Sequence, residues 1–96
     1  MATRVTIYGD PQNSDTKRLE REMNVAYVEF ETIDPRNNAQ AIRHLADWGE
    51  DGATLPMVEV MSQDDSARVF LRNPTEPALR QCLYSEGIVS VTSYWL

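Results

Sequence analysis

Cysteine and histidine are almost missing from this sequence. Cys82 is the one cysteine and His44 the one histidine among 96 residues. A single cysteine rules out a disulfide within the chain, and a lone thiol fits a reducing compartment. A structural zinc site needs four ligands, and neither residue has a Cys or His partner at a suitable spacing. The sequence therefore predicts no structural disulfide and no bound metal.

Positive charge and long apolar runs are also scarce. Lys and Arg number 9 against 15 Asp and Glu, which gives a net charge of −6. Such an acidic chain is a poor match for nucleic-acid phosphates or an anionic membrane. No apolar run reaches the roughly 20 residues of a membrane-spanning helix, and the first residues do not resemble a secretory leader. We expect a cytoplasmic protein that binds neither nucleic acid nor membranes.

The length of the chain matches one small domain, residues 1–96, of alternating strands and helices. β-Branched and alternating runs predict strands at 4–8, 27–33, 55–61 and 67–71. Apolar residues at helical spacing predict three helices: from the turn at 13–15 to about Met23, from about Asn38 to Trp48, and from the cap Thr75 towards Gly87.

Residues suited to helix ends mark these boundaries. Asn13, Ser14 and Asp15 are each good N-cap residues for the first helix. Gly49 and Gly87 are suited to the left-handed conformation that closes the second and third helices. A well-capped helix accounts for the turn at 13–15 without any function.

Apolar side chains predict which side of each later helix faces the core. In the second helix the predicted inner residues are Ala41, Ile42, Leu45, Ala46 and Trp48, and in the third they are Leu79, Cys82 and Leu83. At this spacing Cys82 is expected to be a buried core residue rather than a reactive thiol.

The order strand, helix, strand, helix, strand, strand, helix predicts one mixed four-stranded sheet. This order, the Thr54-Leu55-Pro56 run and the hairpin at 57–71 that leads into a capped helix resemble the glutaredoxin branch of the thioredoxin-like folds. The resemblance covers about residues 4–85. It implies an α/β fold with three helices flanking the sheet, and a cis Leu55–Pro56 bond that faces the turn before the first helix.

The chain departs from that family at the positions that carry its chemistry. Where the family has Cys-Pro-Tyr-Cys, this sequence reads Asn13-Ser14-Asp15-Thr16. Thiol–disulfide exchange requires a thiolate, and no side chain at these positions can supply one. We therefore expect the redox reaction of the family to be absent.

Two functions from different classes remain. The first is a binding or interaction protein that uses the groove between the 13–16 turn and Pro56 for a protein partner or a small peptide-like ligand. The alternative is a glutathione-dependent enzyme in which a hydroxyl of Ser14, Thr16 or Tyr8 stabilises the thiolate of glutathione at the helix N-terminus. In either case we expect a monomer or a weak homodimer. The residues that the resemblance assigns to the groove are Asp10, Asn13, Ser14, Thr16, Lys17, Thr54, Leu55, Pro56, Arg72 and Thr75.

The resemblance raises the question of whether this chain binds glutathione. The family usually carries a basic residue where this chain has Asp10, and two glycines followed by an acidic cap where it has Arg72-Asn73-Pro74-Thr75. An acid facing the carboxylate of glutathione would repel it, and Arg72 would offset part of that repulsion. No cofactor is therefore assigned.

The extension at 86–96 continues past the resemblance and ends in Tyr94, Trp95 and Leu96. Burying such side chains is worth roughly 1.5–3 kcal/mol each, so we expect them to pack on this domain or on a second copy.

Overall fold

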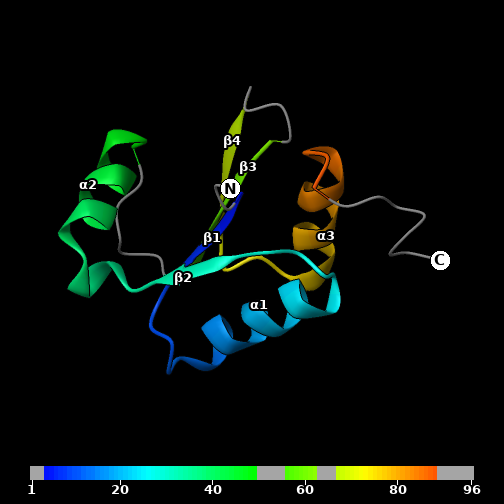
Figure 1. The fold of residues 1–96 in the computed structure, drawn as a ribbon, viewed down its shortest axis with the longest axis horizontal. Helices are drawn as coiled ribbons and strands as arrows, with labels where there is room; N and C mark the ends of the chain where they lie inside the picture. The colour runs from blue at the N-terminus through cyan, green and yellow to red at the C-terminus, as the bar shows by residue number, and fades with distance from the viewer. Residues whose placement is uncertain (1–3, 50–55, 63–66, 89–96) are drawn as a thin grey trace.

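A computed structural model describes residues 4–49, 56–62 and 67–88 (Figure 1). In chain order the elements of these residues are β1 (Val5–Tyr8), α1 (Ser14–Val25), β2 (Glu31–Ile33), the 3₁₀ helix η1 (Pro35–Asn37), α2 (Ala39–Asp47), β3 (Met57–Met61), β4 (Arg68–Arg72) and α3 (Glu76–Ser85). The predicted order of strands and α-helices is confirmed, and the elements form a small mixed α/β fold.

Several predictions concern residues that lie outside the described ranges. These are the groove residues Thr54 and Leu55, the cis bond before Pro56, and the packing of residues 89–96.

The strands of the described residues form a four-stranded mixed sheet in the order β2-β1-β3-β4. β1 is parallel to β2 and antiparallel to β3, which in turn is antiparallel to β4. At the end of β1, Tyr8 pairs with Ile33, and the Gly9 N–H donates to the Ile33 carbonyl at 2.9 Å. Because parallel strands end at the same edge of a sheet, the segments that follow β1 and β2 meet there.

The helices cover both faces of the sheet, with α1 and α3 on one side and α2 on the other (Figure 1). The side under α1 and α3 holds the larger apolar core, because alternate residues of β1 and β3 point to it. Its fully buried members include Val5, Ile7, Leu19, Met23, Val58, Val60, Leu79 and Leu83. Two of the three predicted inner residues of α3 therefore lie in the core, and Cys82 packs against it half-buried.

Helix α2 contacts the sheet through a narrow apolar stripe. Ala41 and Leu45 are its buried residues, one helical turn apart. Ile42 and Trp48 are 54% and 51% exposed, and Ala46 is exposed as well. The prediction that Ile42 and Ala46 face inward is wrong, because a nine-residue helix on the surface needs only one row of contacts to dock. Trp48, just after the helix, is half covered, and its ring lies against Phe70 on β4 with the ring centroids 6.1 Å apart.

A buried carboxylate adds a polar attachment for α2. Glu59 on β3 is 5% exposed, and its carboxylate accepts hydrogen bonds from the Tyr8 hydroxyl at 2.6 Å and from Arg68. His44 on α2 lies 2.9 Å from the same carboxylate through Nε2. The Arg68 guanidinium in turn lies over the Trp48 ring, 5.0 Å from its centroid. A buried charge needs such partners, and here they come from β1, β4 and α2.

The predicted strand at 27–33 is confirmed only for β2. Before it, Tyr27 has φ 58° and is 96% exposed, so it cannot continue a strand. The Val28 N–H donates to the Met23 carbonyl at 3.0 Å, and the Tyr27 N–H to the Asn24 carbonyl at 3.1 Å. This pattern is a Schellman ending of α1, usually made with glycine. This ending of α1 prevents Tyr27 and Val28 from forming a strand, although their side chains favour one.

The other helix ends follow the predictions. Asn13 caps α1 and Thr75 caps α3 through their side-chain oxygens. Gly49 and Gly87 have φ 75° and 78° just after α2 and α3. α1 itself continues two residues past the predicted end at Met23.

No helix within the described part of the chain is both long and apolar enough to cross a membrane.

Replacing Tyr27 with glycine is expected to stabilise the protein. A non-glycine residue in the left-handed region costs roughly 1–2 kcal/mol, whereas glycine adopts it freely but gains entropy in the unfolded chain. We expect Tyr27→Gly to raise the free energy of unfolding by about 0.5–1 kcal/mol in urea denaturation. Tyr27→Ala, which keeps the unfavourable φ, should leave it nearly unchanged; equal stabilisation by both variants would show that the exposed ring, not the backbone, is responsible.

Stability at alkaline pH should depend on Tyr8. Burial, and then the hydrogen bond to Glu59, raise the pKa of the Tyr8 hydroxyl well above its ordinary value. The folded protein therefore holds this proton more tightly than the unfolded chain, and the stabilisation is complete below about pH 10 and lost as the pH rises further.

The free energy of unfolding, measured at increasing pH from about 8 to 11, tests this linkage. Tyr8→Phe should be less stable at neutral pH by about 1 kcal/mol but lose stability less steeply above pH 10. Identical slopes for the two proteins would contradict the assignment.

Candidate ligand-binding site

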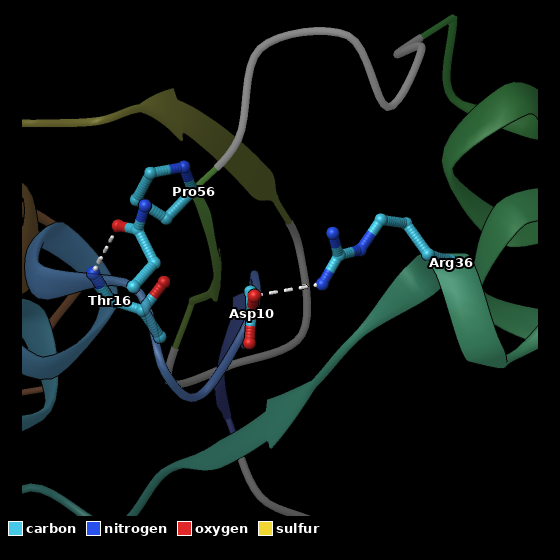
Figure 2. A pocket seen from close by; sticks show the side chains of 5 residues that line it. Asp10, Thr16, Arg36 and Pro56 are labelled. Atoms are coloured by element: carbon cyan, nitrogen blue, oxygen red, sulfur yellow. Dashed lines mark hydrogen bonds and ion pairs between the residues drawn. The ribbon is translucent and has the colours of Figure 1, made fainter.

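A pocket of about 170 Å³ lies at the N-terminus of α1, where β1 and β2 end (Figure 2). Its described lining residues are Asp10, Asn13, Thr16, Arg36 and Pro56. Four of these were predicted as groove residues from the sequence, and Arg36 was not. The structure therefore brings the turn after β1, the first turn of α1, η1 and the start of β3 to one place.

Asn13 lines the pocket as the N-cap of α1. Its side-chain oxygen accepts the N–H groups of Asp15 at 2.8 Å and Thr16 at 3.2 Å. The amide oxygen is therefore used within the helix. The partial positive charge of the helix N-terminus nevertheless lies beside the pocket.

The hydroxyl oxygen of Thr16 is a buried polar atom at the pocket. The residue is fully buried, yet its Oγ1 has no hydrogen-bond partner among the described residues. A Cβ placed on Gly9 would come within 2.6 Å of this oxygen and 3.1 Å of the Pro56 Cβ, so the hydroxyl lies in the space that a side chain at Gly9 would fill. Leaving a buried hydroxyl unpaired costs about 1–3 kcal/mol. A ligand that bonds to it would recover that cost.

Arg36 and Asp10 place opposite charges on the pocket wall. Arg36 Nη2 lies 2.9 Å from Asp10 Oδ2, an ion pair visible in Figure 2. The same guanidinium bonds to Asp34 through Nε and Nη2, at 3.0 and 2.9 Å. A hydrogen bond from the Gln12 backbone and the contact with Arg36 lower the pKa of Asp10, and the two carboxylates raise the pKa of Arg36. Both groups are therefore charged at neutral pH.

The sequence contains a signal for Arg36 in the offsets of two charges from the strand ends. The predicted order strand, helix, strand at the start of the chain is typical of two parallel strands, and such strands end at the same edge. Asp10 stands two residues after β1 and Arg36 three residues after β2. Opposite charges at these offsets predict a contact across the edge.

Four of the predicted site residues that the structure describes do not line the pocket. Those described but absent from its lining, all of them exposed, are Ser14, Lys17, Arg72 and Thr75. The third hydroxyl considered for a thiolate, that of Tyr8, donates to Glu59 on the α2 side of the sheet. Of the candidate hydroxyls, Thr16 is therefore the one in the pocket.

A set of hydrogen bonds fixes the wall around Pro56. The Asn73 N–H donates to the Pro56 carbonyl at 2.8 Å, and Asn73 has φ 40°. Arg18 Nη2 on α1 donates to Asn73 Oδ1 and to the Pro74 carbonyl, both at 3.0 Å. The start of β3, the turn before α3 and helix α1 are thus tied together beside the pocket.

The thiol of the chain lies elsewhere. Cys82 on α3 packs half-buried against the core and does not line the pocket. Burial, with a smaller contribution from Glu86, raises the pKa of its thiol to about 11. At neutral pH it is protonated and a poor nucleophile. Within residues 4–49, 56–62 and 67–88, no group of three or more His, Cys, Asp or Glu side chains could hold a metal ion.

The chain matches no protein-family model, and no curated protein matches it. What the pocket can bind is therefore inferred from the residues that line it.

Proposed function

We propose that this chain is a redox-inactive, glutaredoxin-like binding protein with a thioredoxin-like fold. Its ligand lies in the groove between the 13–16 turn and Pro56. The observation that carries the proposal is the hydroxyl of Thr16, a residue that lines this groove: the hydroxyl is buried next to Gly9 and has no hydrogen-bond partner among the described residues. The order of strands and helices and the sheet order β2-β1-β3-β4 support the resemblance to that family.

The groove has no cysteine side chain that could carry out thiol chemistry. Asn13 and Thr16 stand where the resemblance expects the two cysteines, and both have roles of their own as cap and pocket wall. Cys82 lies outside the pocket and is protonated at neutral pH. Exchange of disulfides requires an accessible thiolate. Binding is therefore a better account of the groove than redox catalysis.

The dimensions of the pocket favour a small, peptide-like ligand. Pockets for drug-sized molecules usually measure about 300–1,000 Å³, and this one is near 170 Å³. Its polar groups include donors on Arg36 and acceptors on Asp10, and the Thr16 hydroxyl can do both. A ligand with amide or similar polar groups can form hydrogen bonds with these donors and acceptors.

A glutathione-dependent enzyme is the second candidate, and Thr16 is the observation that favours it. A hydroxyl in the first turn of a helix can donate to a thiolate. Against it, Asp10 faces the pocket as an acid, and Asn73 is already bonded to Arg18 where the family has glycine. We therefore rank it below binding.

A chemical-shift titration of the ¹⁵N-labelled chain separates the two functions. Trialanine serves as a peptide probe, alongside reduced and oxidised glutathione. Binding predicts saturable shifts at Asn13, Thr16 and Arg36 with trialanine, whereas the enzyme requires them with reduced glutathione. The absence of shifts at these residues with all three probes would contradict the proposed groove.

No disulfide reductase activity is expected from this chain. A glutathione-coupled disulfide reduction assay measures it, because the reaction needs a thiolate at Asn13 or Thr16 and neither residue has sulfur. Cys82→Ser is the control that removes the remaining thiol. Turnover that persists in Cys82→Ser would contradict the assignment.

Restoring both thiols, by Asn13→Cys with Thr16→Cys, is expected to produce weak reductase activity. The helix N-terminus that lowers a thiol pKa is in place at Asn13, whose oxygen already accepts two backbone N–H groups. Asn13→Ser with Thr16→Cys is the matched control, which cannot form a disulfide within the motif. A folded double-cysteine variant without activity would show that the groove no longer accepts the substrates of the family.

A further inference from the structure

The Arg36–Asp10 ion pair on the pocket wall is open to solvent, and Arg36 has a second carboxylate partner. The side chains of Arg36 and Asp10 are 61% and 40% exposed, so their mutual attraction is screened by water. Arg36 is held independently by Asp34, whose side chain is 12% exposed and which also caps η1. Its bonds use Nε and Nη2 and leave the two N–H groups of Nη1 outside them. Separating Arg36 from Asp10 would therefore leave the guanidinium in position.

Two opposite charges on one small wall select the charge of the ligand. A simple anion at Arg36 would also face Asp10, and a simple cation at Asp10 would also face Arg36. A simple anion would be repelled by Asp10 and by the Asp34 carboxylate that already pairs with Arg36. A simple cation on Asp10 would leave Arg36 paired with Asp34 alone, with its Nη1 N–H groups outside that pair. A molecule with one positive and one negative group matches both, and the α1 N-terminus further favours its negative end.

We infer that the pocket binds a free α-amino acid, or a zwitterion of the same size, with its ammonium group on Asp10 and its carboxylate on Arg36. This inference rests on the proposed binding function. The volume of about 170 Å³ suits one such unit. The buried Thr16 Oγ1, without a partner among the described residues, supplies a third contact from the floor between Gly9 and Pro56.

Three small probes test the charge requirement on the full-length ¹⁵N-labelled chain. Alanine carries both charges, alaninamide only the positive one, and propionate only the negative one; sodium chloride matches the ionic strength. Alanine is expected to shift the amides of Asp10, Asn13, Thr16 and Arg36 with a Kd at least about tenfold below that of either analogue, because it alone makes both charge-assisted contacts. Propionate or alaninamide binding as tightly as alanine would overturn the inference.

Substitutions in the pocket test which side chains contact the bound alanine. Asp10→Asn and Arg36→Gln are each expected to raise the Kd for alanine about tenfold, and Thr16→Val severalfold. Glu76→Gln, which breaks a comparable surface pair with Arg80 on α3, is the matched control and should leave the Kd unchanged. Spectra of each variant show whether it is folded. Loss of binding in folded Glu76→Gln, or full binding in both folded charge variants, would overturn the assignment.

Failure of this inference is distinguishable from failure of the proposed function. Trialanine or glutathione shifts at Asn13, Thr16 and Arg36 without any response to alanine would overturn the amino-acid assignment and leave a binding groove. No response to any probe would overturn both.

Discussion

The pairing of β1 with its two neighbours is the constraint on which the rest of this structure depends. β1 lies between β2 and β3, and its parallel pairing with β2 brings the ends of both strands to one edge. Asp10 and Arg36 meet there because each stands just beyond one of these ends. A shift of the β1–β2 register by one residue would move the two charges apart and turn the side chains of β2 to the opposite face. The site is thus a property of strand pairing more than of local sequence.

The two faces of the sheet are held by different forces. The α1 and α3 side is closed by aliphatic packing, which tolerates hydrophobic substitutions of similar volume. The α2 side combines two buried aliphatic residues of the helix with the partners of Glu59. Removing one partner of a buried charge is far more disruptive than removing a surface pair. Since η1 leads directly into α2, the position of Arg36 depends on how well this second face holds its helix.

Features determined by a few neighbouring residues could be predicted from the sequence. The caps Asn13 and Thr75 and the closing Gly49 and Gly87 fall in this group, as does the order of strands and helices. Tyr27 is a local exception, since a residue that favours strands occupies a position usually held by glycine.

Features that need a contact between distant segments could not be predicted from the periodicity of the sequence. The Arg36–Asp10 ion pair is such a contact, between residues 26 positions apart. The Glu59 carboxylate is another, since its partners Tyr8, His44 and Arg68 lie 51, 15 and 9 positions away. For the candidate site, the resemblance indicated Asp10, Asn13, Thr16 and Pro56, but not the cation opposite them.

Gly9 and Thr16 share one small volume, because an added carbon at the first would stand 2.6 Å from the hydroxyl of the second. Gly9 therefore cannot gain a side chain during evolution while Thr16 keeps its hydroxyl in this place. A larger residue at Gly9 requires a smaller one at Thr16, and a hydroxyl at Thr16 is retained only where Gly9 stays without a side chain. In any group of sequences that share this pocket, the two positions should covary, and the pair would mark descendants of the same site even where every other lining residue has diverged.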